Sequence, residues 1–263
     1  MTTRATNSVT IVYPETDGMP LPDGEYQAPL YRRIVRDLEI YIQDTPGARV
    51  NGDTFIYYIE GNPRRSVSPD CYVVFDLSDE ALESIERHNT YLVWEVGKAP
   101  DFVLEIGSPS TAAEDLGRKR DLYADLGVPE YWRYDATGGD FYGEGLVGEH
   151  LVDGEYRRLE MRVDSDGRVW GSSEVLGLDI WWSEDGLRFW DRVSERWVLS
   201  HEEEKAGRLA AETRADVAET RADAAETRAD AAETLVEQER LARLAAEARM
   251  TELESELQRL RGG

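Results

Sequence analysis

Two acidic side chains border apolar segments in positions where they could act together. Glu105 interrupts the run FVLEI at residues 102–106, whose hydrophobic neighbours predict burial on at least one face. An unpaired buried carboxylate is costly, so such a group typically meets a metal ion, a basic side chain or a functional cleft. The alternative is that strand alternation turns Glu105 toward solvent together with Val103. The first interpretation makes Glu105 the leading candidate for chemistry.

Asp70 begins a second apolar segment, CYVVFDL at residues 71–77, directly after Pro69. Alone, an aspartate before a strand indicates turn chemistry. If the two segments are neighbouring strands, Asp70 and Glu105 converge at one edge of a sheet and both become ligands for a hard cation. Mg²⁺ is typically held by one or two carboxylates together with water and phosphate. The pair therefore outlines a Mg²⁺ site for phosphodiester chemistry.

A second Pro-Asp pair, Pro100 and Asp101, competes for the role of Asp70. Asp101 lies four residues before Glu105 on the same segment. Extended backbone of about 3.3 Å per residue separates them by roughly 13 Å, which is too far for one shared ion. Asp70 is therefore preferred.

Lys119 is the third candidate catalytic residue. Asp115 lies four residues before it and Tyr123 four residues after it, so a helix places all three on one face. One interpretation is a routine Asp–Lys helix pair. The other is an amine that leans over the strand ends to orient a water or to stabilise charge on phosphorus. The neighbouring arginines, Arg118 and Arg120, fit a solvated surface as well as a phosphate track.

The elements that position these residues are of mixed α and β type. An amphipathic helix is predicted over residues 28–43, where apolar side chains recur every fourth position. Strands are predicted around residues 53–61, 71–77, 101–106 and 130–135, which are short and rich in β-branched or aromatic residues. The fold class is therefore α/β, with a mixed sheet flanked by helices.

One helix is predicted between the last two of these strands. Thr111 and Glu114 have the spacing of a capping box, and Gly127 with Pro129 ends the helix. The order strand, helix, strand predicts a right-handed parallel crossover. Beyond residue 136, segments punctuated by glycine predict antiparallel strands that extend or flank the sheet.

The C-terminal part repeats ETRAD at residues 212–216, 219–223 and 226–230, a period of seven that is typical of a coiled coil. With Ala215 at position a, the a and d seam consists of Ala215, Ala218, Ala222, Ala225, Ala229, Ala232 and Val236. Glu239 and Arg243 interrupt this seam. It then resumes in phase with Ala246, Met250, Leu253, Leu257 and Leu260.

Charges in the same register favour a parallel pairing of two copies. Arginines occupy g positions and glutamates occupy e positions five residues later, the separation of g to e′ pairs. We therefore expect a homodimer through a coiled coil at residues 201–263, preceded by one domain at residues 20–200. The alternative is a solvated, alanine-rich helix, because an alanine seam buries little apolar area.

The charge balance argues against non-specific binding to nucleic acid. The chain has 30 basic and 54 acidic residues, a net charge of −24. Residues 201–263 account for 10 basic and 16 acidic residues, so the first 200 carry 20 and 38, a net charge of −18. Phosphate neutralisation by a basic face supplies most non-specific affinity. Any site that binds nucleic acid must therefore be confined to a small part of the surface.

Composition indicates a folded cytoplasmic protein. The aromatic content of 10% is too high for a disordered chain. No run approaches the roughly 18 apolar residues of a membrane helix, and the first ten residues have no apolar stretch for a signal peptide. Cys71 is the single cysteine, and three scattered histidines do not form a Cys/His zinc cluster.

The segments GNPRRSVSPDCYVVFDL and YLVWEVGKAPDFVLEIGSPSTAAEDLGRKRDLYADLGVPEYW, with SSEVLGLDI further on, resemble the Uma-two family of restriction endonucleases, a branch of the PD-(D/E)XK nuclease superfamily. The resemblance covers about residues 20–200. It implies a restriction-endonuclease-like core with DNA as substrate, Asp70 and Glu105 as the motif acids that bind Mg²⁺, and Lys119 as a lysine that has moved from the strand to the helix.

Two positions depart from the pattern that the resemblance implies. The superfamily lysine two residues after the acid is replaced by Gly107. A histidine near the start of the first helix is also common in this branch, and Tyr31 stands near that place. Two hypotheses follow. The chain is a metal-dependent DNA endonuclease assembled by its C-terminal helix, or it is a catalytically silent fold that recruits a partner through that helix.

Overall fold

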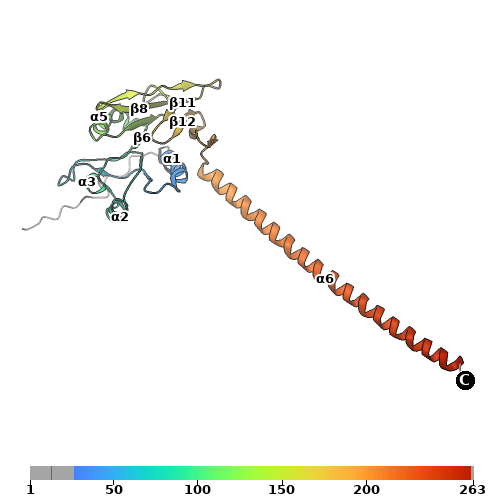
Figure 1. Cartoon of the computed structure of the whole chain (residues 1–263). Coiled ribbons are helices and arrows are strands. Elements are labelled where there is room, and N and C mark those ends of the chain that lie inside the picture. Colours follow the sequence, from blue (N-terminus) through green and yellow to red (C-terminus); the bar gives the residue numbers. More distant parts are fainter. Residues whose placement is uncertain (1–12, 14–26, 262–263) are drawn as a thin grey trace, which may run out of the picture. The chain divides into compact units, whose positions relative to one another are not determined.

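A computed structural model describes Tyr13 and residues 27–261. The chain divides into two compact units, Met1–Glu203 and Glu204–Gly263, which are described separately. The second unit consists of most of one long helix, α6 (His201–Arg261). The first unit has the mixed α/β fold that the sequence predicts (Figure 1).

A six-stranded mixed sheet lies at the centre of the first unit. Its strand order is β1 (Arg49–Asn51), β4 (Cys71–Val74), β6 (Phe102–Ile106), β7 (Glu130–Tyr134), β8 (Leu146–Val152) and β9 (Glu155–Arg158). Strands β6 and β7 are parallel, as the strand–helix–strand order predicts, and the other neighbours are antiparallel. Strands β4 and β6 are direct neighbours, so the segments that carry Asp70 and Glu105 lie side by side.

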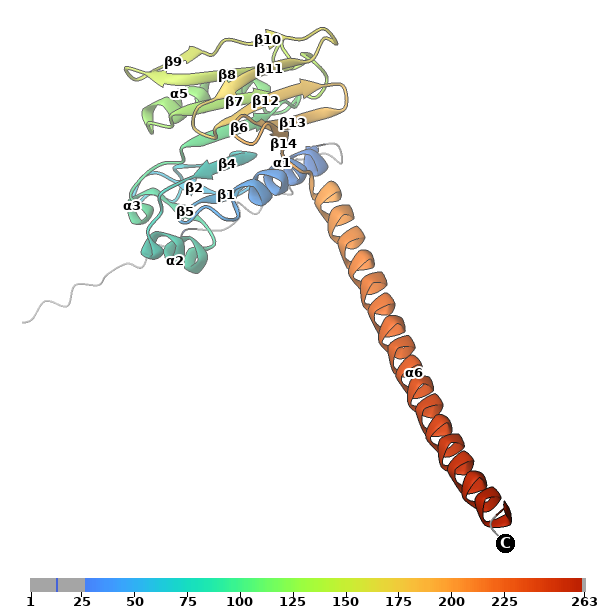
Figure 2. The same cartoon turned by 45° about the vertical axis from the view of Figure 1, so that its right-hand side comes forward.

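One face of the central sheet packs against α1 (Gln27–Ile42) and a second, five-stranded antiparallel sheet (Figures 1 and 2). This second sheet has the order β10 (Arg162–Val163), β11 (Val169–Ser173), β12 (Leu178–Ser183), β13 (Gly186–Asp191) and β14 (Arg196–Trp197). The interface is apolar. Leu38 on α1, Leu104 on β6 and Ile180 on β12 are all fully buried in it.

The other face of the central sheet packs against helices and a small three-stranded sheet. The helices are α2 (Asp79–His88), α3 (Val93–Val96), α4 (Ala112–Leu116) and α5 (Arg118–Asp125). The small sheet has the order β3 (Ser66–Val67), β2 (Ile56–Tyr57) and β5 (Tyr91–Leu92). Val103 of β6 and Tyr123 of α5 are fully buried in this second apolar cluster. The predicted strand at residues 53–61 is therefore short and belongs to a separate sheet.

The prediction of one continuous helix between β6 and β7 is wrong, because Gly117 divides it into α4 and α5. Gly117 has φ −124° and ψ −98°, far from helical values. The predicted capping box is also absent. Thr111 makes no side-chain cap; instead the hydroxyl of Ser108 accepts a hydrogen bond from the Thr111 N–H at 3.2 Å.

Candidate functional site

Glu105 is fully buried on β6 and points toward α5. Its Oε1 accepts a hydrogen bond from the Tyr123 hydroxyl at 2.7 Å, and its Oε2 lies 3.0 Å from Nζ of Lys119. The alternative of a solvent-facing glutamate is therefore wrong. On this strand Val103 and Glu105 share the face that α5 covers, so alternation directs the carboxylate into the protein.

Asp70 meets Glu105 at the start of β4. Its Oδ2 accepts a hydrogen bond from the N–H of Ile106 at 2.7 Å, and its own N–H approaches Glu105 Oε2 at 3.4 Å. Antiparallel pairing of β4 with β6 causes this meeting, because Cys71 pairs with Leu104 and Asp70 therefore falls opposite the end of β6. The structure thus brings together the two acids that the sequence pairs.

Asp101 takes no part in this cluster. Its Oδ2 accepts hydrogen bonds from the Phe75 N–H and from Lys98 Nζ, both at 2.8 Å. These contacts tie the beginning of β6 to the end of β4. Asp101 therefore has a structural role at the opposite end of the strand from Glu105.

Lys119 joins the acids from α5. Its Nζ lies 3.0 Å from Glu105 Oε2 and 2.9 Å from Asp115 Oδ1, and its side chain is only 11% exposed. The interpretation as a routine helix pair is therefore incomplete, because the ammonium also contacts a strand residue. Lys119 and Tyr123 lie one turn apart on α5, and Asp115 contacts the same ammonium from α4, so the three side chains meet as their spacing predicts although the helix is divided.

Tyrosine side chains hold this cluster in place. The hydroxyl of Tyr142 donates to Asp115 Oδ2 at 2.7 Å, and the hydroxyl of Tyr131 donates to the Asp115 carbonyl at 2.9 Å. Asp135 in turn accepts hydrogen bonds from the N–H groups of Phe141 and Tyr142, at 2.7 and 3.1 Å. The sequence analysis did not identify Tyr131, Tyr142 or Asp135. Only tertiary folding brings Tyr142, 27 residues away along the chain, to Asp115.

The electrostatics of the cluster follow from burial and neighbouring charge. The pKa of Glu105 is raised to about 8: burial is the largest cause, the ammonium of Lys119 opposes it, and the negative charges of Asp70 and Asp115 add to it. Burial alone would lower the pKa of Lys119. Its carboxylate neighbours, Glu105 first, outweigh that effect and raise the pKa above its ordinary value. Lys119 is therefore a permanent cation near neutral pH.

The loop after β7 fills the space that a side chain at position 107 would need. A Cβ at this position would lie 3.1 Å from Cε2 of Tyr142 and 3.2 Å from Cβ of Phe141. The site consequently has a lysine at position 119 on the helix and none on the strand.

The donor atoms of Asp70 and Glu105 are of the type that Mg²⁺ prefers. In the part of the chain that the structure describes, no three His, Cys, Asp or Glu side chains gather as a metal-binding group. The protein's share of a Mg²⁺ site would thus be two carboxylates, with water and phosphate completing the shell. These two residues fit a weakly held, hydrated Mg²⁺ ion and do not form the closed ligand shell of a structural metal site.

The first unit is therefore an α/β domain whose central strands carry two acids and whose crossover helix carries a lysine against them. A family model described as "Uma2: Putative restriction endonuclease" matches residues 15–185, which is more than half of the chain. The chain belongs to this family.

Among solved structures, the chain is similar to a protein from Anabaena variabilis ATCC 29413, whose title describes a "putative nuclease belonging to DUF820". The two share 16% sequence identity over 56% of this chain and 76% of that one, with a TM-score of 0.37. No curated protein matches the chain. Among the described residues, no helix is long and apolar enough to cross a membrane.

Proposed function

We propose that the chain is a Mg²⁺-dependent DNA endonuclease that hydrolyses phosphodiester bonds. The observation that carries the proposal is the meeting of Asp70, Glu105 and Lys119 at the junction of β4, β6 and α5. The chain belongs to a family that is described as restriction endonucleases, and this membership supports DNA as the substrate. A free, buried Cys71 fits the reducing cytoplasm in which we place the protein.

Each residue has a distinct task in this proposal. Asp70 and Glu105 would hold Mg²⁺, which when bound polarises a phosphate and lowers the pKa of a coordinated water. Asp70 is already oriented by the Ile106 N–H, and Glu105 by the Tyr123 hydroxyl. The carboxylates are therefore arranged before the ion arrives.

Lys119 acts as a fixed positive charge. Because neighbouring carboxylates raise its pKa, it remains protonated at neutral pH and is a poor general base. An ammonium held by Glu105 and Asp115 instead donates hydrogen bonds to a water or to a non-bridging phosphate oxygen. Its role is to position the nucleophile and to stabilise the charge that develops on phosphorus.

The competing function is a catalytically silent fold that recruits partners. The observation that favours it is the charge of −18 on the first 200 residues, which opposes a strong grip on DNA. Several arginines near the site are also neutralised. Arg120, for example, contacts Glu149 at 2.9 Å.

A plasmid assay separates the two functions. Supercoiled DNA is incubated with Mg²⁺ and the wild-type protein, Asp70→Ala or Glu105→Ala, and nicked product is measured. We expect nicking by the wild type and loss of at least a hundredfold in both variants. The control is Glu114→Gln, which alters an exposed acid on α4 outside the cluster. Equal nicking by all four proteins, or none by the wild type, removes the nuclease proposal.

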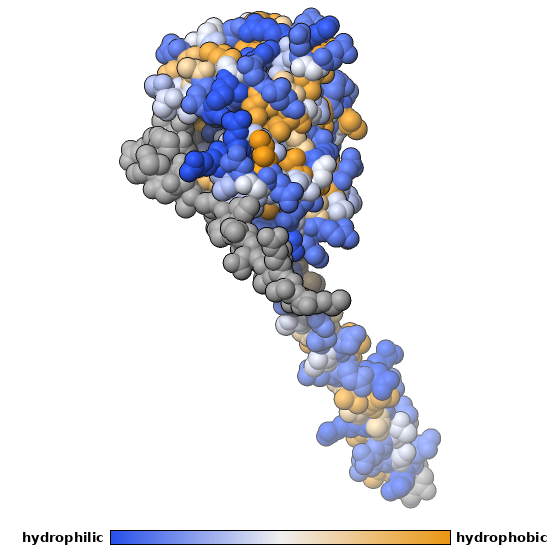
Figure 3. All heavy atoms as spheres, turned by 90° about the vertical axis from the view of Figure 1, so that its left-hand side faces the viewer, coloured by the Kyte–Doolittle hydropathy of each residue, from blue (hydrophilic) through white to orange (hydrophobic). Residues whose placement is uncertain are grey.

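We also propose that α6 pairs with α6 of a second copy in a parallel coiled coil. Every residue from 205 to 260 is exposed in the single chain, including apolar side chains such as Leu253 and Leu257. Figure 3 shows apolar side chains among hydrophilic ones along this helix. A helix of 61 residues extends for about 90 Å and buries no apolar face by itself. A second copy would cover the seam.

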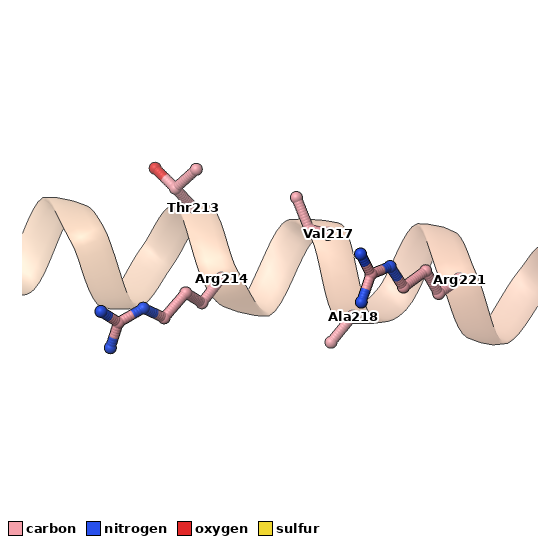
Figure 4. A pocket seen from close by; sticks show the side chains of 5 residues that line it. All are labelled: Thr213, Arg214, Val217, Ala218 and Arg221. Carbon is pink, nitrogen blue, oxygen red and sulfur yellow. The ribbon is translucent and has the colours of Figure 1, made fainter.

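The repeats supply charge complementarity for this pairing. Ala218 occupies a d position between Arg214 and Arg221. All three residues line one shallow depression of about 400 Å³ on the helix (Figure 4). Within the described chain, neither arginine forms an ion pair. In the proposed parallel pairing, both would meet glutamates of the other helix. Deletion of residues 206–263 should lower the mass measured by light scattering by more than half, because the dimer is lost together with 58 residues of the chain. A mass that falls only by the deleted residues would contradict the dimer.

A further inference from the structure

The outward face of the second sheet carries a continuous row of tryptophan and arginine. Arg162, Trp170, Trp181 and Arg188 are direct partners on the four neighbouring strands β10 to β13. Directly paired residues project to the same side of a sheet. The alternating residues, such as Ile180, point to the buried core on the other side. The row therefore faces away from the core.

The rings of this row contact one another and the guanidinium groups. Trp170 and Trp181 stack with centroids 5.1 Å apart and an interplanar angle of 13°. Trp197 on β14 packs edge-on against Trp181 at 5.6 Å. Arg188 lies over the Trp197 ring, with its Cζ 5.6 Å from the ring centroid. Large aromatic rings on a solvent-facing sheet indicate a binding surface.

A cavity of about 340 Å³ opens beside this row, between α1 and the β12–β13 hairpin. Its lining includes Trp181 and Trp197 and the three arginines Arg33, Arg168 and Arg188. Two acidic residues, Asp185 and Glu203, also line it. The arginines have further acidic partners, since Arg168 lies 2.7 Å from Asp164, so the cavity offers guanidinium donors and not an excess of positive charge.

Acidic partners orient the arginines of the cavity but use only some of their N–H donors. Arg188 contacts Glu203 through Nη2 at 3.2 Å, and Arg33 lies 3.8 Å from Asp37 through Nε. A guanidinium has five N–H donors in a planar fork, so each such contact occupies a fraction of them. The remaining donors suit phosphate oxygens. Trp181 already stacks with Trp170 and has the Arg168 guanidinium over its ring, whereas Trp197 is 36% exposed and suits stacking with a base.

The cavity lies toward the end of the central sheet that carries the acids. A Cβ at Gly186, in the β12–β13 turn, would lie 3.3 Å from Arg33 Nη1 and 3.9 Å from the Tyr134 hydroxyl. Tyr134 on β7 is the register partner of Ile106, the residue after Glu105. The cavity and the proposed nuclease site therefore lie toward the same end of the central sheet but on opposite faces, because Tyr134 packs on the side of α1 and Glu105 packs against α5.

We propose that this tryptophan–arginine surface binds a single-stranded segment of nucleic acid, with a base stacked on the exposed Trp197 and phosphates on Arg33 and Arg188. The inference rests on the proposed function in that DNA is the substrate. A duplex keeps its bases stacked inside the helix and offers none to the indoles. The surface therefore selects DNA with an unpaired stretch over continuous duplex.

Binding is measured by fluorescence anisotropy with a labelled 12-nucleotide oligothymidine, on the full chain in EDTA so that no cleavage occurs. We expect Trp197→Ala and Arg188→Ala each to weaken binding about tenfold. Trp197→Phe, which keeps an aromatic face, should retain most of the affinity. The matched control is Arg158→Ala, an exposed arginine on β9 that is paired with Glu144, which should bind like the wild type.

The outcomes distinguish this inference from the proposed function. A wild type that binds the oligonucleotide in EDTA but does not nick plasmid in Mg²⁺ supports the surface and overturns the nuclease proposal alone. Equal affinity of the wild type, Trp197→Ala and Arg188→Ala overturns the inference. Equal affinity for a 12-base-pair duplex also overturns it. A drop in oligomer mass in Trp197→Ala without any change in binding assigns the surface to a second copy instead.

Discussion

Nζ of Lys119 lies 3.0 Å from Oε2 of Glu105, although the lysine belongs to α5 and the glutamate to β6. The same ammonium contacts Asp115 one turn earlier on the polypeptide. A cation held by two carboxylates has little freedom of movement. Its position relative to the strand ends is therefore fixed before any substrate binds.

Replacing Lys119 by Gln should reduce plasmid nicking by about a hundredfold or more, because it removes the fixed charge at the site. Arg118→Gln is the matched control, since its guanidinium is exposed and pairs with Glu114 outside the cluster. Thermal unfolding should show that both variants are folded at the assay temperature. Similar nicking rates for the two variants would contradict the role of Lys119.

Gly107→Lys should destabilise the protein by about 1–3 kcal/mol, because the new side chain meets Phe141 and Tyr142. Urea unfolding measures this loss. The same substitution combined with Lys119→Gln should not restore nicking, since Tyr142 occupies the space that the strand lysine would need. Recovery of activity in the double variant would show that the two lysine positions are equivalent.

Asp135→Asn should make stability less sensitive to acid. Although burial alone raises the pKa of Asp135, hydrogen bonds from Thr137, Phe141 and Tyr142 lower it below its ordinary value. The folded protein thus binds this proton less readily than the unfolded chain, and stability falls as the pH drops below the ordinary pKa near 4.

The measurement for Asp135 is urea unfolding of both proteins between pH 7 and pH 3. The variant should be less stable by about 1–3 kcal/mol at pH 7, and the difference should shrink toward pH 3. A difference that stays constant over this range would contradict the assignment. Nicking should also fall in the variant at pH 7, because Asp135 positions the loop that carries Tyr142.

Leu253→Lys with Leu257→Lys should convert the proposed dimer to a monomer, because both leucines occupy the proposed seam and a lysine there cannot be buried between the helices. Leu241→Lys with Leu244→Lys is the matched control. These leucines are equally exposed in the single chain but lie at f and b positions of the same register. Light scattering measures the masses. A monomer in the control as well would place the contact elsewhere on α6.

Much of the core could be predicted from sequence, since local patterns determine it. The apolar runs at 71–77 and 101–106 predict strands, and their pairing brings Asp70 beside Glu105. The spacing of Asp115, Lys119 and Tyr123 predicts that the three side chains lie together against the sheet, and they do although α4 and α5 are separate helices.

The other features of the fold and of the site depend on tertiary contacts that no local sequence pattern encodes. Gly117 has an ordinary helical context, yet its backbone divides α4 from α5. Tyr142 reaches Asp115 only because Asp135 folds the intervening loop, and no periodicity connects these residues. The second sheet covers α1 and β6 through long-range packing, so its tryptophan face could not be located from alternation within each strand.

The central claim is that Asp70 and Glu105 together hold one divalent cation. Crystals soaked in Mn²⁺, which substitutes for Mg²⁺ and scatters anomalously, test this most directly. We predict a single anomalous peak within about 2.5 Å of a carboxylate oxygen of each residue, and its loss in Glu105→Ala. A peak elsewhere, or none at the wild-type site at millimolar Mn²⁺, would contradict the account.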